Sequence, residues 1–260
     1  MSTKFSIVSV SFNNYDGLVS TWHSLKSQCH ENWHWIVIDG GSIDQTINWL
    51  HKIAENKYRD KITFTSEPDN GIYDAMNKGI SKASGEYIIF MNGGDCFAST
   101  DALSRVNQSI NETGPDFIYC DAYEVIEGGV KKLKKARRHR WIWYGMFAHH
   151  QAMIFKMSHL GTLRYRMEYT IGGDYAFIAE YLQHASSIVK LDFPFCTFIR
   201  GGVSTIGEGI KQGYIDQQNI RKRIMKMNMP LIVSIGFVHK IMNSLRSELP
   251  YIYYFFRGMK

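Results

Sequence analysis

Cysteine is scarce in this chain of 260 residues, which has only four cysteines and no CxxC spacing. This scarcity excludes a disulfide scaffold and a cysteine zinc site, and it fits free thiols in a reducing compartment. Long apolar runs are also missing, because no stretch approaches the roughly 20 residues that span a bilayer. The opening residues, MSTKFSIVSVSF, lack the apolar region and cleavage site of a signal peptide. We therefore expect a cytoplasmic protein.

Two nucleotide-binding signatures are absent as well. No GxGxxG occurs, which argues against a dinucleotide-dependent dehydrogenase. The first loop, SFNNYDGL, does not supply the glycine-rich, Arg/Lys-bearing segment of sugar nucleotidyltransferases, so that class is disfavoured. Internal repeats and low-complexity linkers are not found either.

Charge is unevenly distributed along the chain, whose net charge is +6. Residues 1–130 carry 9 Lys/Arg against 17 Asp/Glu, whereas residues 131–260 carry 21 against 7. Such a chain has an acidic half and a basic half with different partners. We expect the basic half to face an anionic partner: membrane lipid, a phosphorylated acceptor or nucleic acid.

The first half alternates between β-branched apolar runs and amphipathic stretches. This alternation predicts βαβ units in a doubly wound, mostly parallel α/β sheet with helices on both faces. In such sheets ligands bind at the carboxyl ends of the strands, where the candidate residues are Ser11, Asn13, Asp39, Asp69 and Asp95. The predicted strands are 5–12, 34–39, 61–67 and 86–91, and the predicted helices include 44–53 and 71–83.

The second half is less regular. We predict strands at 116–126, 152–155 and 193–199, and a helix at 172–182 that opens with two glycines. Residues 206–260 are expected to form a helical, basic, aromatic-rich appendage.

In the segment FMNGGD (90–95), the end of a predicted buried strand is followed by two glycines and one carboxylate. Glycines allow a ligand to approach the backbone closely. Mg²⁺ usually takes one or two protein carboxylates, with phosphate oxygens and water completing its shell. Asp95 alone would therefore suffice as a metal ligand if a diphosphate supplied the rest. The alternative is a solvated turn.

Two further segments offer polar groups at strand ends. Asp39 in DGGSIDQT would accept hydrogen bonds from a nucleobase or ribose, or would form an Asx-turn or helix cap. Asp69 precedes an amphipathic helix on which Lys78 either pairs with Asp74 on the surface or points at phosphate.

Together the segments FSIVSVSFNN, VIDGGSIDQT and SEPDNGIYDAMNKGISKASGEYIIFMNGGD closely resemble the family 2 glycosyltransferases of the GT-A fold. The resemblance is nearest to bacterial members that build capsule, O-antigen or colanic acid. It is strong over residues 4–96 and looser to about 205. It implies a GT-A domain over 1–205, with a nucleotide-sugar half (1–96) and an acceptor half (97–205).

The resemblance also implies roles for single residues. Ser11, Asn13 and Asp39 would hold the nucleotide, and Asp95 corresponds to the last aspartate of the DxD motif, which meets Mn²⁺ or Mg²⁺ and the diphosphate. The first aspartate of that motif is a glycine here. The family inverts configuration with a general base that maps onto Asp174 in IGGDYAF, where a helix N-terminus keeps a carboxylate ionised.

Donor and acceptor contacts are expected from two more segments. In FAHHQAMIF, neighbouring histidines on a strand would point to opposite faces, which argues against a shared metal ion. His150 and Gln151 are interpreted as contacts to sugar or acceptor, with a structural pair as the alternative. In IRGGVST, Arg200 and Gly202 are expected near the donor diphosphate.

The run KKLKKARRHRWIWYG (131–145) joins seven Lys/Arg to two tryptophans. It suits a membrane interface, an undecaprenyl-diphosphate acceptor, nucleic acid or a solvated loop. The C-terminal appendage would lie on a membrane, or would pack on protein, including a second subunit.

We therefore expect an inverting transfer of a hexose from a nucleotide diphosphate sugar, with UDP favoured, to a growing lipid-linked glycan at the cytoplasmic face of the inner membrane. A non-catalytic GT-A-like domain that binds anionic lipid or nucleic acid is the alternative.

Overall fold

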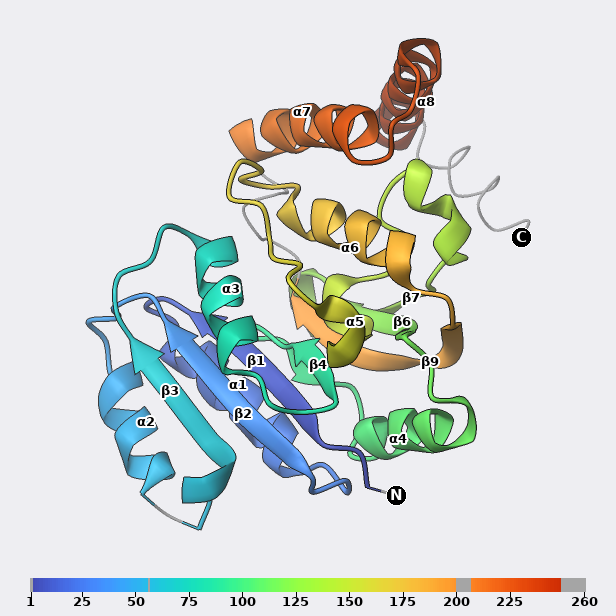
Figure 1. Ribbon diagram of the computed structural model, residues 1–260. Helices are drawn as coiled ribbons and strands as arrows, with labels where there is room; N and C mark the ends of the chain where they lie inside the picture. Colours follow the sequence, from blue (N-terminus) through green and yellow to red (C-terminus); the bar gives the residue numbers. More distant parts are fainter. Residues whose placement is uncertain (1, 56, 200–206, 249–260) are drawn as a thin grey trace.

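The computed structural model describes residues 2–55, 57–199 and 207–248. The described segments form one nine-stranded sheet with helices on both faces, and two further helices stack above it (Figure 1). The strands are β1 Phe5–Ser11, β2 Trp33–Asp39, β3 Ile62–Ser66, β4 Tyr87–Phe90, β5 Cys96–Phe97, β6 Phe117–Val125, β7 Lys131–Lys134, β8 Met153–Lys156 and β9 Ile188–Ile199. The helices are α1 Tyr15–Lys26, α2 Thr46–Ala54, α3 Ile72–Lys82, α4 Ala102–Thr113, α5 Met157–Leu160, α6 Gly173–His184, α7 Glu208–Arg223 and α8 Met229–Glu248.

The central strands are buried on both faces, which explains their continuous apolar sequences. In β1, Phe5 and Ile7 point into one core cluster, whereas Val8 and Val10 point into the other. Successive side chains of a strand alternate between faces, so a strand covered on both sides carries apolar residues on both faces.

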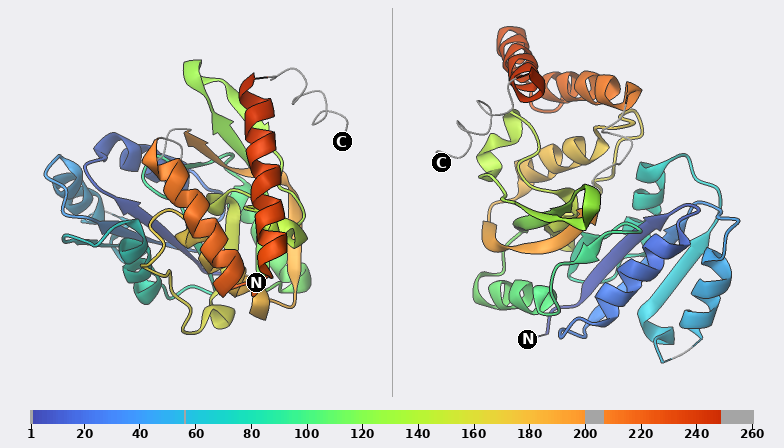
Figure 2. Two further views of the ribbon diagram at one scale, coloured as in Figure 1. Left: turned by 90° about the horizontal axis from the view of Figure 1, so that it is seen from above. Right: turned by 180° about the vertical axis from the view of Figure 1, so that it is seen from behind.

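Each face of the sheet has its own set of helices. Helices α1, α2 and α4 contribute to the cluster on one face, and α3 and α6 contribute to the cluster on the other. Figure 2 shows the first set in front when the molecule is viewed from behind. The arrangement leaves the carboxyl ends of β1 to β4 open as a shared edge.

The sheet is mixed rather than mostly parallel. Its order is β3-β2-β1-β4-β8-β6-β9-β5, with β7 added to β6. Strands β3, β2, β1 and β4 run parallel, but β8 lies antiparallel between β4 and β6. An apolar run such as AMIF carries no mark of its direction, so the sequence did not reveal this reversal.

The segment after Asp95 contains elements that the sequence analysis did not predict. A short strand, β5, pairs with β9, and α4 then covers the sheet through Leu103, Val106 and Ile110. Helix α4 ends at Gly114, whose φ of +55° is the left-handed conformation that favours glycine at a helix end. The first four residues of the basic run form β7.

The two C-terminal helices form a further layer above α6 (Figures 1 and 2). Ile220 and Ile224 join Tyr175 and Ala179 of α6 in a third apolar cluster. Arg221 is fully buried, and it donates hydrogen bonds to the carbonyls of Trp143 and Tyr144 at 3.0 and 2.8 Å. Helix α7 is therefore integrated with the core. Within the described segments, no helix combines the length and apolarity needed to cross a bilayer.

Candidate functional site

Asp39 organises the turn at the end of β2. Its Oδ2 accepts hydrogen bonds from the Gly41 and Ser42 N–H groups (3.1 and 2.8 Å) and from Ser66 Oγ (2.7 Å). Ser42 Oγ donates to Oδ1, and the residue is 0% exposed. The carboxylate is thus occupied by its own turn, as the Asx-turn interpretation expected. Its predicted direct contact with a nucleotide stays a prediction.

The ends of β1 and β3 converge on the same turn. Asn13, at a φ of +47°, accepts a hydrogen bond from the Ile43 N–H (2.9 Å). Asp69 accepts one from the Gly71 N–H (2.8 Å), and its other oxygen lies 2.8 Å from where a Cβ on Gly40 would stand. A larger residue at position 40 would therefore collide with Asp69. The ends of β1 and β3 thus both pack against the turn that follows β2.

Lys78 pairs with acidic neighbours on α3 and the preceding loop. Its Nζ lies 3.0 Å from Glu67 Oε1 and 3.4 Å from Asp74 Oδ2. The hydrogen bond to Glu67 and the charge of Asp74 raise the pKa of Lys78. A hydrogen bond from the Asn70 N–H, together with the charge of Lys78, lowers the pKa of Asp74. The four-residue pair suggested by the sequence is present, and Lys78 is absent from the cavity described below.

The NGGD loop is held from α1. Thr21 Oγ1 accepts a hydrogen bond from the Gly94 N–H (3.0 Å) and donates to the Asp95 carbonyl (2.8 Å). Gly94 has a φ of +104°, and a Cβ on Gly93 would stand only 3.4 Å from Ser11 Oγ. The glycines therefore serve both the turn and its close approach to β1.

The Asp95 side chain is half-buried at the wall of the cavity described below. Burial raises its pKa to about 7, although a hydrogen bond from the Gln151 side chain opposes this shift. A carboxylate desolvated in this way gains from a nearby cation. In the same loop, Asn92 Oδ1 is buried and has no hydrogen-bond partner among the described residues, as is also true of Ser11 Oγ at the end of β1.

These oxygen atoms suit a divalent ion whose shell is completed by substrate. In the described part of the chain, no three His, Cys, Asp or Glu side chains converge to hold a metal ion. Mg²⁺ needs only one or two carboxylates when phosphate oxygens and water supply the rest. Asp95, with Asn92 Oδ1 beside it in sequence, fits this kind of partial site.

Asp174 begins α6, where its Oδ1 accepts the Tyr175 N–H (2.7 Å). Burial raises the pKa of Asp174 to about 6, and the hydrogen bond from Tyr175 partly offsets this effect. Burial raises the pKa values of the Tyr73 and Tyr165 hydroxyls, and the nearby charge of Asp174 raises them further. The group is thus a weak base that is ionised at neutral pH.

The two histidines of FAHHQAMIF diverge. His150 forms a 2.8 Å hydrogen bond with the Tyr165 hydroxyl and stacks on Phe90, and burial lowers its pKa to about 4. His149 stacks on Phe198 with ring centroids 3.5 Å apart. They belong to a loop and 3₁₀ turn rather than to a strand, and their rings stack on different aromatic partners.

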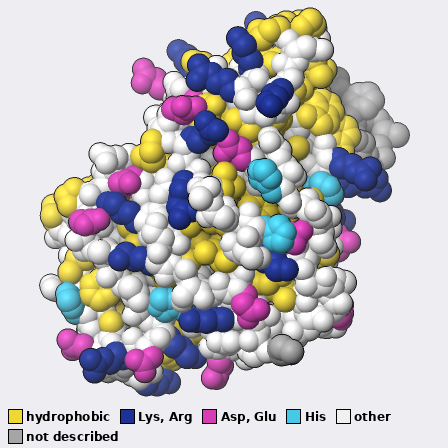
Figure 3. Space-filling view, viewed as in Figure 1, with side chains coloured by type: hydrophobic (Ala, Val, Ile, Leu, Met, Phe, Trp, Pro, Cys, Tyr) yellow, Lys and Arg dark blue, Asp and Glu magenta, His cyan; other side chains and the backbone are white. Residues whose placement is uncertain are grey.

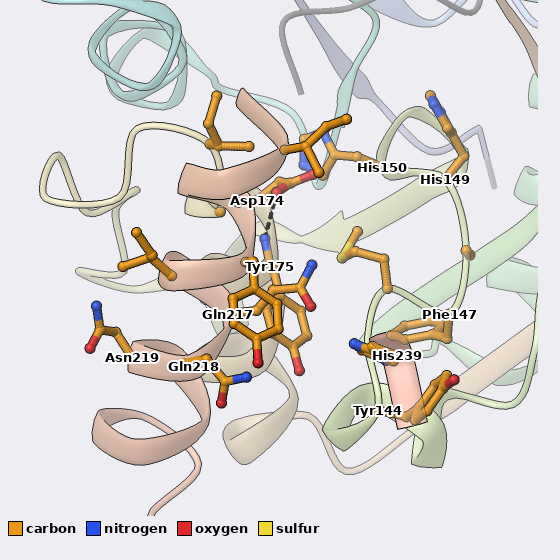
Figure 4. A pocket seen from close by; sticks show the side chains of 18 of the residues that line it. Tyr144, Phe147, His149, His150, Asp174, Tyr175, Gln217, Gln218, Asn219 and His239 are labelled. Atoms are coloured by element: carbon orange, nitrogen blue, oxygen red, sulfur yellow. Dashed lines mark hydrogen bonds between the residues drawn. The ribbon is translucent and has the colours of Figure 1, made fainter. Parts of the chain in front are cut away.

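Asp95 and Asp174 both line one cavity of about 2260 Å³. His150 and Gln151 line it too, although Asp95 and Asp174 come from different halves of the GT-A segment predicted from the sequence. Figure 4 shows Gln217, Gln218 and Asn219 of α7 on one side of this cavity and Tyr144, Phe147 and His239 on the other. Of the remaining predictions, Ser11, Asn13, Asp39 and Asp69 lie at the neighbouring strand ends, and Arg200 and Gly202 lie outside the described residues.

The basic run provides cavity residues that the sequence analysis did not assign to the site. Lys134, Lys135 and Arg137 line the cavity, and Lys134 Nζ lies 5.1 Å from the centre of the Phe198 ring. The far wall is apolar and comes from α8 through Met229, Val233 and Phe237 in particular. Only the fold brings these segments beside Asp174.

Curated relatives match parts of the chain. An uncharacterized glycosyltransferase of Mycobacterium tuberculosis is 36% identical over 111 residues, which cover 42% of this chain and 41% of the relative. A PGL/p-HBAD biosynthesis glycosyltransferase of Mycobacterium bovis is 26% identical over 183 residues, 66% of this chain and 67% of that one. The chain thus spans about two fifths of the length of the first relatives it matches.

Solved structures share the fold at low sequence identity. Staphylococcus aureus TarS (residues 1–349, in complex with UDP-GlcNAc) superposes with a TM-score of 0.68 at 18% identity, covering 94% of this chain and 73% of TarS. The mannosyltransferase PcManGT of Pyrobaculum calidifontis, in complex with GDP-Man and Mn²⁺, superposes with a TM-score of 0.66 at 11% identity. The superposition covers 100% of this chain and 80% of PcManGT. These likenesses confirm the predicted α/β GT-A fold.

The family assignment rests on sequence. The sequence model described as glycosyl transferase family 2 matches residues 6–177, from the first strand to the first turns of α6. This range includes both Asp95 and Asp174. The chain belongs to glycosyl transferase family 2.

Proposed function

We propose that the protein is an inverting glycosyltransferase that moves a hexose from a nucleotide diphosphate sugar, with UDP favoured, to a lipid-linked acceptor in bacterial surface-glycan synthesis. One observation carries the proposal: two desolvated carboxyl groups, Asp95 and Asp174, line the same cavity beside the carboxyl ends of the parallel strands. Paired carboxyl groups with raised pKa values in one cavity are typical of a catalytic site.

Asp95 would receive the donor diphosphate. The polar groups of Ser11, Asn13, Asp69 and the Asp39 turn lie at the neighbouring strand ends and would take the nucleoside. Mn²⁺ or Mg²⁺ held by Asp95 would neutralise charge on the leaving diphosphate. The fold relatives support this assignment, because TarS was solved with UDP-GlcNAc and PcManGT with GDP-Man and Mn²⁺.

Asp174 would act as the general base. The acceptor hydroxyl attacks the anomeric carbon, the bond from that carbon to the diphosphate oxygen breaks, and the hydroxyl proton passes to Asp174. A single displacement of this kind inverts the anomeric configuration. With a pKa of about 6, the carboxylate is ionised at neutral pH yet basic enough to accept a proton.

The cavity walls support a lipid-linked acceptor. Lys134, Lys135 and Arg137 would meet acceptor phosphates, and the apolar side chains of α8 would meet a lipid chain. Relatives named for PGL/p-HBAD and teichuronic acid biosynthesis also support a glycan or glycolipid acceptor.

Peripheral contact with an anionic membrane at its cytoplasmic face is part of the proposal. Figure 3 shows hydrophobic side chains beside Lys and Arg at the end of the molecule formed by α7 and α8. On α8, Phe237 is 65% and Val233 62% exposed. Trp141 and Trp143, which follow the cavity lysines in sequence, are also exposed. Exposed cations on the two helices and their connection are Lys211, Lys222, Arg223, Lys226 and Lys240.

A vesicle flotation experiment tests this membrane contact. We expect flotation with vesicles that contain anionic lipid and none with purely zwitterionic vesicles; equal behaviour with both would contradict this contact.

Calorimetric titration of UDP, with and without Mn²⁺, tests the donor site. We expect Mn²⁺ to increase UDP affinity at least about tenfold in the natural protein and to have no effect in Asp95→Asn, which removes the charged ligand. Asp16→Asn, an exposed aspartate on α1, is the matched control and should retain the full metal effect. UDP binding that ignores the metal in the natural protein would remove the donor-site assignment.

A further inference from the structure

The loop that carries Asp174 is held by a buried aspartate of α7. We propose that Asp216 is a positioning residue for the candidate base: it fixes residues 171–173 and thereby the first turn of α6. The inference rests on the proposed function, because it assigns to Asp216 a role in the reaction at Asp174.

The contacts of Asp216 are directed at the loop backbone. Its Oδ2 accepts hydrogen bonds from the Ile171 N–H (3.0 Å) and the Gly172 N–H (2.9 Å). Gln212, one turn earlier on α7, donates from Nε2 to Oδ1 at 2.7 Å. Asp216 is 1% exposed. Because three hydrogen bonds converge on this buried carboxyl group, it forms a stiff clamp on two consecutive peptide groups.

The opposite side of the loop is held by α3. The Tyr73 hydroxyl donates to the Ile171 carbonyl at 2.7 Å. A Cβ on Gly173 would stand 2.5 Å from the Tyr73 ring, and a Cβ on Gly172 would stand 2.7 Å from the Cβ of Asp216. The two glycines of IGGD are thus explained by close packing on both sides, and the loop cannot shift without displacing α3 or α7.

Asp174 follows this clamped segment directly. The Gly172 carbonyl accepts the Ala176 N–H (2.9 Å), so the clamped residue also begins the hydrogen bonding of α6. Neither Asp216 nor Gln212 is among the residues that line the cavity, whereas Asp174 is. Asp216 therefore acts through the backbone rather than by touching substrate. Since a displacement of about 1 Å can reduce a rate on the order of 100-fold, the clamp matters for kcat.

Steady-state kinetics of Asp216→Ala and Asp216→Asn test the proposal. In Asp216→Ala we expect kcat to fall about 10- to 100-fold, with the donor KM within about twofold and a shifted acid limb of the kcat–pH profile. Asp216→Asn should recover most of kcat, because its amide oxygen can accept from both N–H groups while Gln212 reverses its own amide. Glu208→Ala, an exposed acidic residue at the start of the same helix, should behave as the natural protein.

The outcomes separate the two proposals. An inactive natural protein contradicts the proposed function, and an Asp174→Asn variant with nearly natural activity contradicts the role of Asp174 as the base. If the natural protein is active and Asp174→Asn is not, an Asp216→Ala variant with unchanged kcat and pH profile overturns the positioning role. Should Asp216→Ala not fold, Gln212→Leu removes the brace from Oδ1 at a site off the cavity. It should then lower kcat about 3- to 10-fold at unchanged donor KM, and an unchanged kcat would overturn the role.

Discussion

The carboxyl group of Asp39 at the end of β2 differs from those of Asp95 and Asp174 in the cavity in how many hydrogen bonds it receives. At the end of β2, Asp39 is fully buried yet accepts four hydrogen bonds from its own turn and from Ser66. In the cavity, Asp95 receives a hydrogen bond from the Gln151 side chain and Asp174 receives one from the Tyr175 N–H. Burial raises the pKa of both cavity groups.

The difference shows that burial alone does not mark a reactive carboxylate. What matters is whether the fold supplies enough donors to replace the lost water. Asp39 is supplied internally and stabilises a turn, whereas Asp95 and Asp174 retain capacity for a cation, a proton or a substrate hydroxyl. The comparison predicts that substitutions in the two groups will have different consequences.

The largest effect is expected from Asp174→Asn, which removes the candidate base and keeps its size. We expect kcat to fall by about 10²- to 10⁴-fold, the usual contribution of a general base. UDP affinity should be unchanged, because Asp95 and the strand ends remain. A folded variant that transfers sugar at nearly the natural rate would show that another group accepts the proton.

The pH profile of the natural protein provides the check on this variant. Because Asp174 must be ionised, kcat should fall as pH drops through about 6, its raised pKa, and not near the ordinary value of a carboxyl group. The sign follows from the chemistry: protonation below this pH removes the base. An acid limb near pH 4 would mean that the rate-controlling carboxyl group is well hydrated, which would break the comparison with Asp39.

A smaller effect, on stability rather than rate, is expected from Asp39→Ala. The variant leaves the N–H groups of Gly41 and Ser42 without their acceptor, so the free energy of unfolding should drop by roughly 1–3 kcal/mol. Urea denaturation followed by circular dichroism measures this change. Asp60→Ala, an exposed aspartate, should cost less than about 0.5 kcal/mol. Equal costs at both positions would mean that the Asp39 turn contributes nothing specific.

Much of the fold was predictable because strands β1, β2 and β4 are buried on both faces. Their continuous apolar runs and the helical spacing of α3 depend on local sequence, so their positions follow from it. Helix α4 was missed, since its polar face breaks the pattern with Asn107, Gln108 and Asn111. The antiparallel entry of β8 was missed because strand direction is set by its neighbours.

The candidate site was predictable only in parts. The resemblance in sequence selected Asp95 and Asp174, and the glycines beside each gave a local signal of close packing. Asp216 had no such signal, because GYIDQQN reads as an ordinary exposed helix. The basic run gave the charge but not its location, and the fold places three of its cations in the cavity wall.

The sequence by itself determined the family and the strands of the first half of the chain, and it selected Asp95 and Asp174 as candidates, because these depend on local pattern. Tertiary structure decided how many hydrogen-bond donors each carboxyl group receives, and that α7 clamps the loop before Asp174. Hydration and hydrogen-bond supply depend on residues distant in sequence, so only the folded chain could assign Asp39 to a turn and Asp95 and Asp174 to the cavity.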